Sequence, residues 1–128
     1  MQHEICIQTN AEQEIIDITA QIEKMINIKQ GICTVYVPHA TAAIMINESA
    51  DPNIMEDILT ALDKIIPAGK WKHDAIDNNG AAHIKAGLIG PSEQIPILNG
   101  KLGLGTWQGI MLCDFDGPRK RKIIVMVQ

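Results

Sequence analysis

The stretch Pro38–Pro52, PHATAAIMINESADP, places side chains that can do chemistry at the ends of two apolar runs. His39 follows the first run, and Glu48 and Asp51 follow the second. An imidazole can carry a proton or bind a metal ion, and a carboxylate can serve as a base or a ligand. Protein scaffolds commonly display functional groups at such element edges. The structural alternative makes His39 a turn residue and Asp51 the cap of a helix that begins at Pro52.

Three of the four histidines are predicted to lie in loops or at strand edges. His39 closes an apolar run, His73 lies in a long polar loop at 70–82, and His83 begins the next apolar stretch. Imidazole nitrogens and carboxylate oxygens are the usual ligands of zinc and similar divalent ions. A divalent ion, zinc or magnesium, held by these three histidines is therefore a candidate cofactor. Their spacing matches no local zinc motif, so three unrelated surface histidines stay an alternative.

Three further residues are candidates for binding a substrate. Arg119, directly after Gly117-Pro118, is the member of the cationic run 119–122 best placed to bind phosphate, because guanidinium binds phosphate in a bidentate manner. The run as a whole is expected to be a solvated hairpin edge. Trp107 either stacks on a flat ring or fills the core, and we expect the core. Ser92 lies in a Gly-Pro-Ser turn with no activating base nearby in the sequence.

Composition narrows the class of protein. A chain of 128 residues makes a single domain, 1–128, and with 3% aromatic residues its core must consist of isoleucine, leucine, valine and methionine. The net charge of −4 argues against a general nucleic-acid-binding protein. Three cysteines within apolar runs indicate buried thiols in a reducing compartment. With no signal peptide and no membrane-length apolar run in view, we expect a cytoplasmic protein that does not bind membranes.

Hydrophobic periodicity predicts an antiparallel α+β domain in which two helices accompany seven or eight strands. One helix is expected between Ile18 and Gln30, and the other spans 52–66, with an apolar stripe along one side. Asn99-Gly100 predicts a two-residue hairpin turn. The expected strands are 3–8, 32–37, 43–46, 84–89, 94–98, 102–104, 107–115 and 122–127, and 13–18 is a further candidate.

These residues together resemble the YjbQ family, commonly named secondary thiamine-phosphate synthase. The resemblance covers essentially the whole chain and rests on PHATAAIMINE with ADP (38–52), the His73 loop, AHIKAGLIGPSEQIPILNGKLGLGTWQ (82–108) and FDGPR (115–119). Two departures stand out. Family members often read His-Thr-Thr where this chain has His39-Ala40-Thr41, and the segment before His83, including 78–80, varies.

The resemblance implies a two-layer, β-rich, sandwich-like α+β fold that assembles as a homotrimer with sites near subunit boundaries. It also implies an activity that joins a pyrimidine diphosphate to a thiazole phosphate and releases diphosphate. By similarity, the residues lining the pocket would be His39, Glu48, Asp51, His73, His83 and Arg119.

The residues themselves fit this activity in part. Release of diphosphate requires neutralisation of its charge, normally by a divalent ion and cationic side chains. The histidines with Glu48 would hold the ion, Arg119 would bind phosphate, and Trp107 would stack on the pyrimidine. The chain lacks the rich set of lysines and arginines expected for two phosphorylated substrates. Two alternatives therefore stay open: a metal-dependent hydrolase of a small metabolite, and a non-catalytic trimeric module that binds a small anion.

Overall fold

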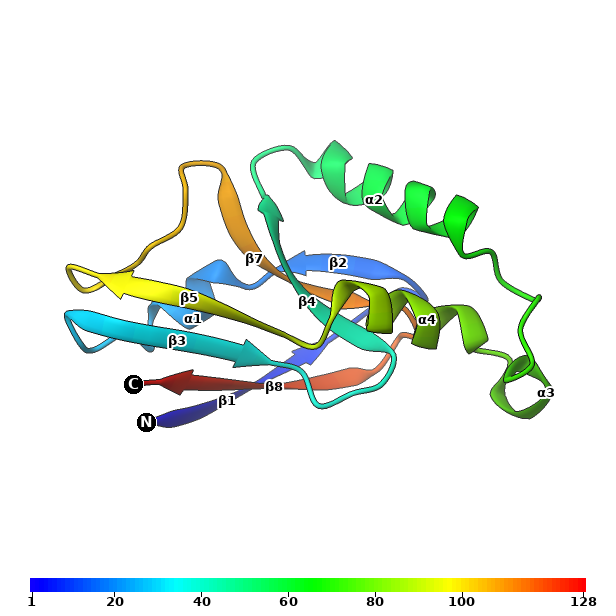
Figure 1. The fold of residues 1–128 in the computed structure, drawn as a ribbon, viewed down its shortest axis with the longest axis horizontal. Helices are drawn as coiled ribbons and strands as arrows, with labels where there is room; N and C mark the ends of the chain where they lie inside the picture. The colour runs from blue at the N-terminus through cyan, green and yellow to red at the C-terminus, as the bar shows by residue number, and fades with distance from the viewer.

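In the computed structural model, which describes residues 1–128, eight strands form two antiparallel sheets and four helices accompany them (Figure 1). The five-stranded sheet has the order β1-β8-β3-β5-β6, and the three-stranded sheet has the order β2-β7-β4. The strands are β1 (Gln2–Gln8), β2 (Glu14–Asp17), β3 (Gln30–Tyr36), β4 (Ala42–Glu48), β5 (Ser92–Leu98), β6 (Lys101–Leu102), β7 (Gln108–Asp114) and β8 (Lys120–Val127). The helices are α1 (Thr19–Glu23), α2 (Pro52–Ile65), α3 (Asp74–Asp77) and α4 (Gly80–Ile89). The predicted antiparallel α+β class is confirmed.

The main core lies between the two sheets. Val35 and Val125 point inward from the five-stranded sheet, and Ile44 and Leu112 point inward from the three-stranded sheet. Their exposed fractions are all 0%. Burying a side chain of this kind stabilises a fold by roughly 1.5–3 kcal/mol. The alternation along β3 and β8 therefore fixes which side chains of each strand face the opposite sheet.

A second core covers the other face of the three-stranded sheet. Met111 and Cys113 of β7 pack there against Leu62 of α2 and Ala82 of α4. Every residue of β7 after Gln108 is buried, because this central strand has the five-stranded sheet on one face and helices on the other. The two sheets thus form the predicted sandwich, and α2 and α4 add a helical layer.

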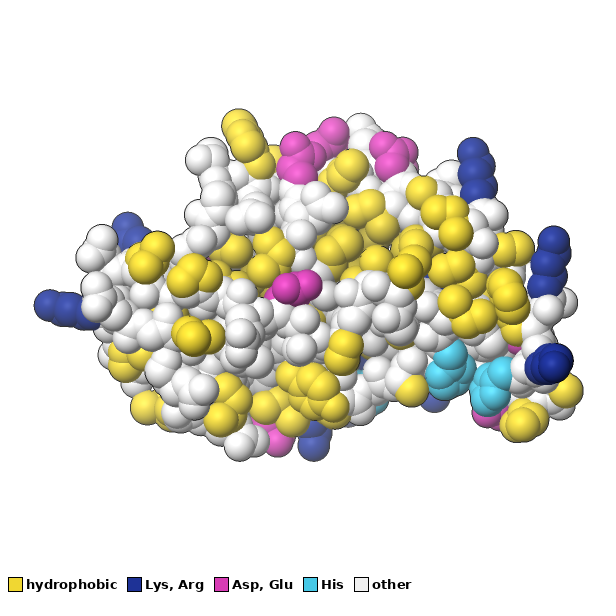
Figure 2. All heavy atoms as spheres, in the orientation of Figure 1, with side chains coloured by type: hydrophobic (Ala, Val, Ile, Leu, Met, Phe, Trp, Pro, Cys, Tyr) yellow, Lys and Arg dark blue, Asp and Glu magenta, His cyan; other side chains and the backbone are white.

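Helix α2 covers this sheet only in part. Asp51 caps its N-terminus by accepting a hydrogen bond from the backbone N–H of Asn53 at 2.9 Å, as the sequence predicts. Of its own residues only Leu62 is buried, and Ile65 is 70% exposed. Figure 2 shows apolar side chains gathered on the face between α2 and α4. The helical layer therefore leaves apolar surface exposed.

The segment predicted as a strand at 84–89 is instead the second half of helix α4. Its buried side chains include Ala82, Lys85 and Ala86, a spacing that places one helical face on the sheet. The strand prediction followed the larger side chains Ile84 and Ile89 and gave no weight to the alanines. With α3 inside the predicted polar loop, the chain has four helices where two were expected.

The first helix is also shorter than predicted. Helix α1 ends at Glu23, and β3 already begins at Gln30. No helix of the structure is long and apolar enough to cross a membrane.

Candidate functional site

The predicted site residues fall mainly at the two ends of β4. The His39 end comprises Thr9, His39, Thr41, Ser92, Asp114, Arg119 and Arg121, which lie where β1, β3 and β7 finish and β4, β5 and β8 begin. The Glu48 end comprises Glu48, Ser49, Asp51, Trp107 and Gln108, where β4 leads towards α2. At the rise per residue of an extended strand, the six residue steps from Ala42 to Glu48 separate the two ends by roughly 20 Å.

A buried ion pair anchors the His39 end. Arg121 Nη2 donates to Asp114 Oδ1 at 2.6 Å and to the Thr41 hydroxyl at 2.9 Å, and Thr9 Oγ1 donates to Asp114 Oδ2 at 2.7 Å. The side chains of Arg121 and Asp114 are 3% and 0% exposed. Burial raises the pKa of Asp114, but hydrogen bonds from Arg121, the Asp116 N–H and Thr9 outweigh burial and hold that pKa below its ordinary value. Asp114 is therefore ionised and joins the two sheets electrostatically.

This ion pair was not predicted from the sequence. The expectation of a solvated cationic run is wrong for Arg121, which is buried, whereas its neighbours Lys120 and Lys122 are exposed. The signal was the two-residue alternation, because Arg121 shares a face of β8 with the buried Ile123. By the same rule Asp114 follows Leu112 towards the interior.

His39 lies directly beside this pair. Its Nε2 accepts a hydrogen bond from the backbone N–H of Lys122 at 2.9 Å. The proton of the neutral ring is therefore on Nδ1, which makes that atom a hydrogen-bond donor. Burial lowers the pKa of His39, and the positive charges of Arg121, Lys122 and Arg119 lower it further against the opposing effect of Asp114. His39 is thus a neutral donor in a cationic environment.

Arg119 is more exposed and is oriented by the turn before it. Its Nε donates to the backbone oxygen of Asp116 at 2.7 Å, and its Nη2 donates to the Asp116 carboxylate at 3.2 Å. The same carboxylate oxygen accepts a hydrogen bond from Asn79 at 2.9 Å, which links the turn to α4. Nη1 of Arg119 donates to no group of the chain and can bind a ligand. Ser92 is exposed at the start of β5, paired with Tyr36.

His73 and His83 form a pair beside α4. Their rings meet edge to face with centroids 4.7 Å apart, and His73 Nε2 lies 3.7 Å from Asp77 Oδ2. That nitrogen is buried and has no hydrogen-bond partner. No group of three or more His, Cys, Asp or Glu side chains within the chain is arranged to hold a metal ion. The site of His39, His73 and His83 is not formed by one chain and stays a prediction for an assembly.

The Glu48 end is exposed and has few side-chain contacts. The Glu48 carboxylate makes no ion pair or hydrogen bond, and Trp107 is 65% exposed, so the expectation that Trp107 fills the core is wrong. Trp107 is free to stack on a flat ring. A cavity of ≈ 400 Å³ lies at this end, lined by Asp17, Thr19, Ala20, Glu23, Ser49 and Gln108.

Comparison with known proteins identifies the relatives of this chain. A family model described as UPF0047 protein YjbQ-like matches residues 3–128. A UPF0047 protein of Archaeoglobus fulgidus is 47% identical over 95% of this chain and 97% of its own length. The UPF0047 protein YugU of Bacillus subtilis is 43% identical over 90% of this chain and 89% of its own.

Solved structures share the fold throughout. A YjbQ/UPF0047 protein of Clostridium acetobutylicum superposes with a TM-score of 0.94 at 47% identity, covering 98% of this chain and 99% of its own. A hypothetical protein of Aeropyrum pernix K1 gives a TM-score of 0.96 at 36% identity, covering 100% and 98%. Both chains of each comparison are covered almost completely, so the likeness extends over the sandwich and the helical layer together.

Proposed function

The chain belongs to the YjbQ-like UPF0047 family, and from this premise we propose that it is an enzyme acting on a small phosphorylated metabolite. The reaction to test first joins a pyrimidine diphosphate to a thiazole phosphate and releases diphosphate, as the resemblance implies. In that reaction the new bond forms as the carbon–oxygen bond to diphosphate breaks, and the electron pair leaves with the diphosphate. The protein must therefore stabilise negative charge on the leaving group.

One observation carries this proposal: positive charge is concentrated at the His39 end of a chain whose net charge is −4. Arg119, Arg121 and Lys122 all lie close enough to His39 to lower its pKa. Arg121 is paired with Asp114 and Arg119 with Asp116, but Arg119 keeps a free Nη1, and His39 has its Nδ1 proton to donate. These donors suit a phosphate group, because hydrogen bonds from charged donors to phosphate are strong.

The Glu48 end supplies what the His39 end lacks. Exposed Trp107 can stack on an aromatic ring, and the unpaired Glu48 carboxylate can bind a metal ion or accept a proton. A single small metabolite cannot span the roughly 20 Å between the two ends of β4. The proposed site therefore takes the His39 end from one subunit and the Glu48 end from its neighbour.

A homotrimer satisfies this requirement. A contact between two different surfaces of the same chain forms a closed ring when the rotation from each subunit to the next is a third of a full turn. Such a ring of three copies contains three equivalent sites. The apolar face between α2 and α4, with Ile65, Ile84 and Leu88 exposed, is consistent with an assembly of this kind.

A divalent ion stays part of the proposal. His73 and His83 lie side by side, and His73 Nε2 is buried without a partner, which fits a pair of imidazole ligands. The further ligands would come from a neighbouring subunit. The ion would neutralise charge on the leaving diphosphate, and zinc and magnesium are the ions to test.

Mixing two inactive variants tests the shared site. His39→Ala inactivates the His39 end, and Glu48→Gln inactivates the Glu48 end. Each variant alone should lose most turnover of the pyrimidine diphosphate and thiazole phosphate. When the two variants are unfolded and refolded together, their chains assemble into mixed trimers at random. About one site in four then combines a wild-type His39 end with a wild-type Glu48 end, so about a quarter of wild-type activity should return. Mixing His39→Ala with Arg119→Ala, two changes at the same end, should restore none and is the control.

The assay is run with and without added zinc or magnesium, beside light scattering at micromolar concentration. A particle of 14.0 kDa, the mass of one chain, would overturn the shared site. Turnover of the mixture that stays at the level of the control would overturn it as well. Saturable binding of diphosphate in calorimetry without turnover of any substrate would instead identify the anion-binding module.

A further inference from the structure

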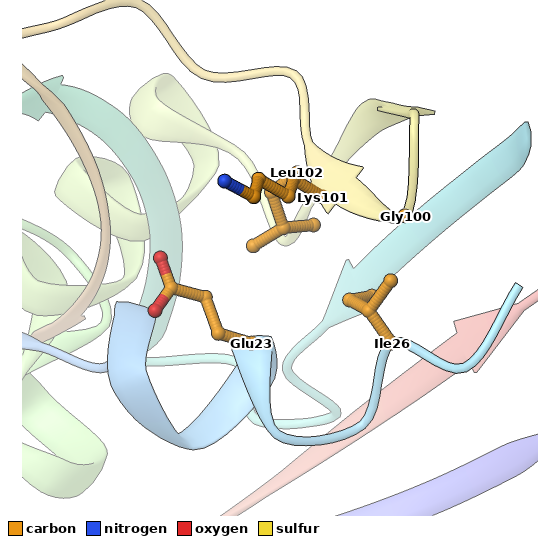
Figure 3. A pocket seen from close by; sticks show the side chains of 5 residues that line it. All are labelled: Glu23, Ile26, Gly100, Lys101 and Leu102. Atoms are coloured by element: carbon orange, nitrogen blue, oxygen red, sulfur yellow. The ribbon is translucent and has the colours of Figure 1, made fainter. Parts of the chain in front are cut away.

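A cavity of ≈ 370 Å³ lies at the opposite end of the five-stranded sheet from His39, between α1 and the β5–β6 hairpin. Its lining consists of Glu23, Ile26, Gly100, Lys101 and Leu102 (Figure 3). Glu23 also lines the cavity at the Glu48 end, and the other four residues belong to neither end of β4. The volume lies in the range of small-molecule sites in proteins.

The hairpin that forms one wall is held in place. Asn99 and Gly100 have φ of 52° and 79°, which confirms the predicted two-residue turn. The N–H of Gly100 donates to the backbone oxygen of Lys29 at 3.0 Å, and the N–H of Gly103 donates to that of Pro96 at 2.7 Å. The first bond ties the hairpin to the segment that follows α1, and the second joins the two arms of the hairpin, so backbone hydrogen bonds hold this wall of the cavity in place.

Two opposite charges border the cavity and have no ion-pair partner. Neither the Glu23 carboxylate nor the Lys101 ammonium forms an ion pair or a side-chain hydrogen bond. Figure 3 shows their charged ends on the same side of the cavity, one from α1 and one from β6. A ligand that carries an ammonium and a carboxylate close together would satisfy both.

Two apolar side chains occupy the space beside these charges. In Figure 3, Ile26 and Leu102 point towards each other across the cavity. Both pack against the main core and leave part of their surface uncovered. An aliphatic group placed between them would lose contact with water, and burial of a leucine-sized side chain is worth far more than an exposed ion pair.

From these four side chains we infer that the cavity binds a free amino acid with an aliphatic side chain. Its ammonium pairs with Glu23, its carboxylate pairs with Lys101, and its side chain inserts between Ile26 and Leu102. This site lies outside the proposed phosphate site and does not depend on the proposed reaction.

Calorimetry with a graded set of probes tests the inference. L-Leucine should bind saturably, and glycine should bind at least tenfold more weakly because it has no side chain to bury. N-acetyl-L-leucine lacks the ammonium and leucinamide lacks the carboxylate, and each should lose affinity about three- to fivefold, as expected for one exposed ion pair. The double variant Glu23→Gln/Lys101→Gln should lose about tenfold or more.

The control variant removes one negative and one positive charge at positions away from the cavity. Glu56→Gln/Lys64→Gln alters two exposed residues of α2 and should bind L-leucine as the wild type does. Circular dichroism confirms that both variants fold. The inference is overturned if L-leucine gives no saturable signal, if glycine binds equally well, or if Glu23→Gln/Lys101→Gln retains wild-type affinity. His39→Ala should leave L-leucine binding unchanged, which separates this site from the His39 end of the proposed enzyme site.

Discussion

The two ends of β4 carry the same kinds of side chain in opposite environments. At the His39 end, Asp114 and Arg121 are buried, paired with each other and hydrogen-bonded to Thr9 and Thr41. At the Glu48 end, the carboxylate has no partner and lies in reach of water. A buried charge without its partner is costly, whereas an exposed one is not.

This difference separates two roles for charged residues. The buried pair connects the sheets and positions the groups that bind a ligand, so its loss should weaken the fold. The half-buried Glu48 carboxylate has no partner in its own subunit, so its loss should affect only function. The variants below test this division, beginning with the largest expected effect.

Breaking the buried pair should have the largest effect. Arg121→Met leaves Asp114 ionised in the interior with one strong partner fewer, and removal of one member of a buried pair costs roughly 3–5 kcal/mol of unfolding free energy. Urea denaturation followed by circular dichroism measures the loss. A cost below about 1 kcal/mol would show that water replaces the guanidinium.

The double variant Arg121→Met/Asp114→Leu sharpens this result. Because both charges are gone, it should recover much of the stability lost by Arg121→Met alone. A double variant as unstable as the sum of two single losses would mean that the hydrogen bonds to Thr9 and Thr41, and not the ion pair, stabilise this end.

At the opposite end, Glu48→Gln should leave the unfolding free energy nearly unchanged. It keeps the shape of the side chain but cannot accept a proton at neutral pH. Turnover should fall at least tenfold, about 1.4 kcal/mol of barrier, when measured with the pyrimidine diphosphate and thiazole phosphate. If Glu48→Gln instead destabilises the fold while activity per folded molecule stays normal, Glu48 is structural.

Much of the fold could be predicted because its strands follow simple rules. The expected ranges overlap all eight strands of the structure, and Asp51-Pro52 placed the start of α2 correctly. Helix α4 was missed because it buries alanines, which a search for large apolar side chains overlooks. Its apolar residues Ile84 and Leu88 are exposed, so they misled the prediction.

The candidate site was predictable in its residue types but not in its geometry. Sequence order suggested that His39, Glu48 and Asp51 act together because they are close along the chain. Because β4 is extended, its two ends lie far apart. Residues on opposite sides of β4 are therefore close in sequence but distant in space. Conversely, Asp114 and Arg121 meet because β7 and β8 lie in different sheets that face each other, which no local pattern shows.

Removal of the α2 cap should have a moderate effect. Asp51→Ala leaves the backbone N–H of Asn53 without its partner and should cost about 1 kcal/mol. A loss of this size lowers the melting temperature by roughly 3–4 °C in a domain of this length. Asp51→Ser, which can cap as well, should melt close to the wild type. Equal losses in the two variants would show that Asp51 acts through its charge and not as a cap.

The smallest effect concerns the pH dependence of stability at the His39 end. The pKa of His39 is lowered by burial and by Arg121, so the unfolded chain binds a proton more readily than the folded one. Stability is therefore full above the unfolded value, about 6.5, and falls as the pH drops from there through the lower folded pKa. Protonation of Nε2 would also break the hydrogen bond from the Lys122 N–H.

His39→Gln isolates this contribution, because its amide oxygen can accept the same hydrogen bond but does not titrate. The slope of unfolding free energy against pH, measured between about pH 5 and 7, should be shallower in His39→Gln than in the wild type. If His39→Gln and the wild type show equal slopes, the His39 end is not the pH-sensitive end of the molecule.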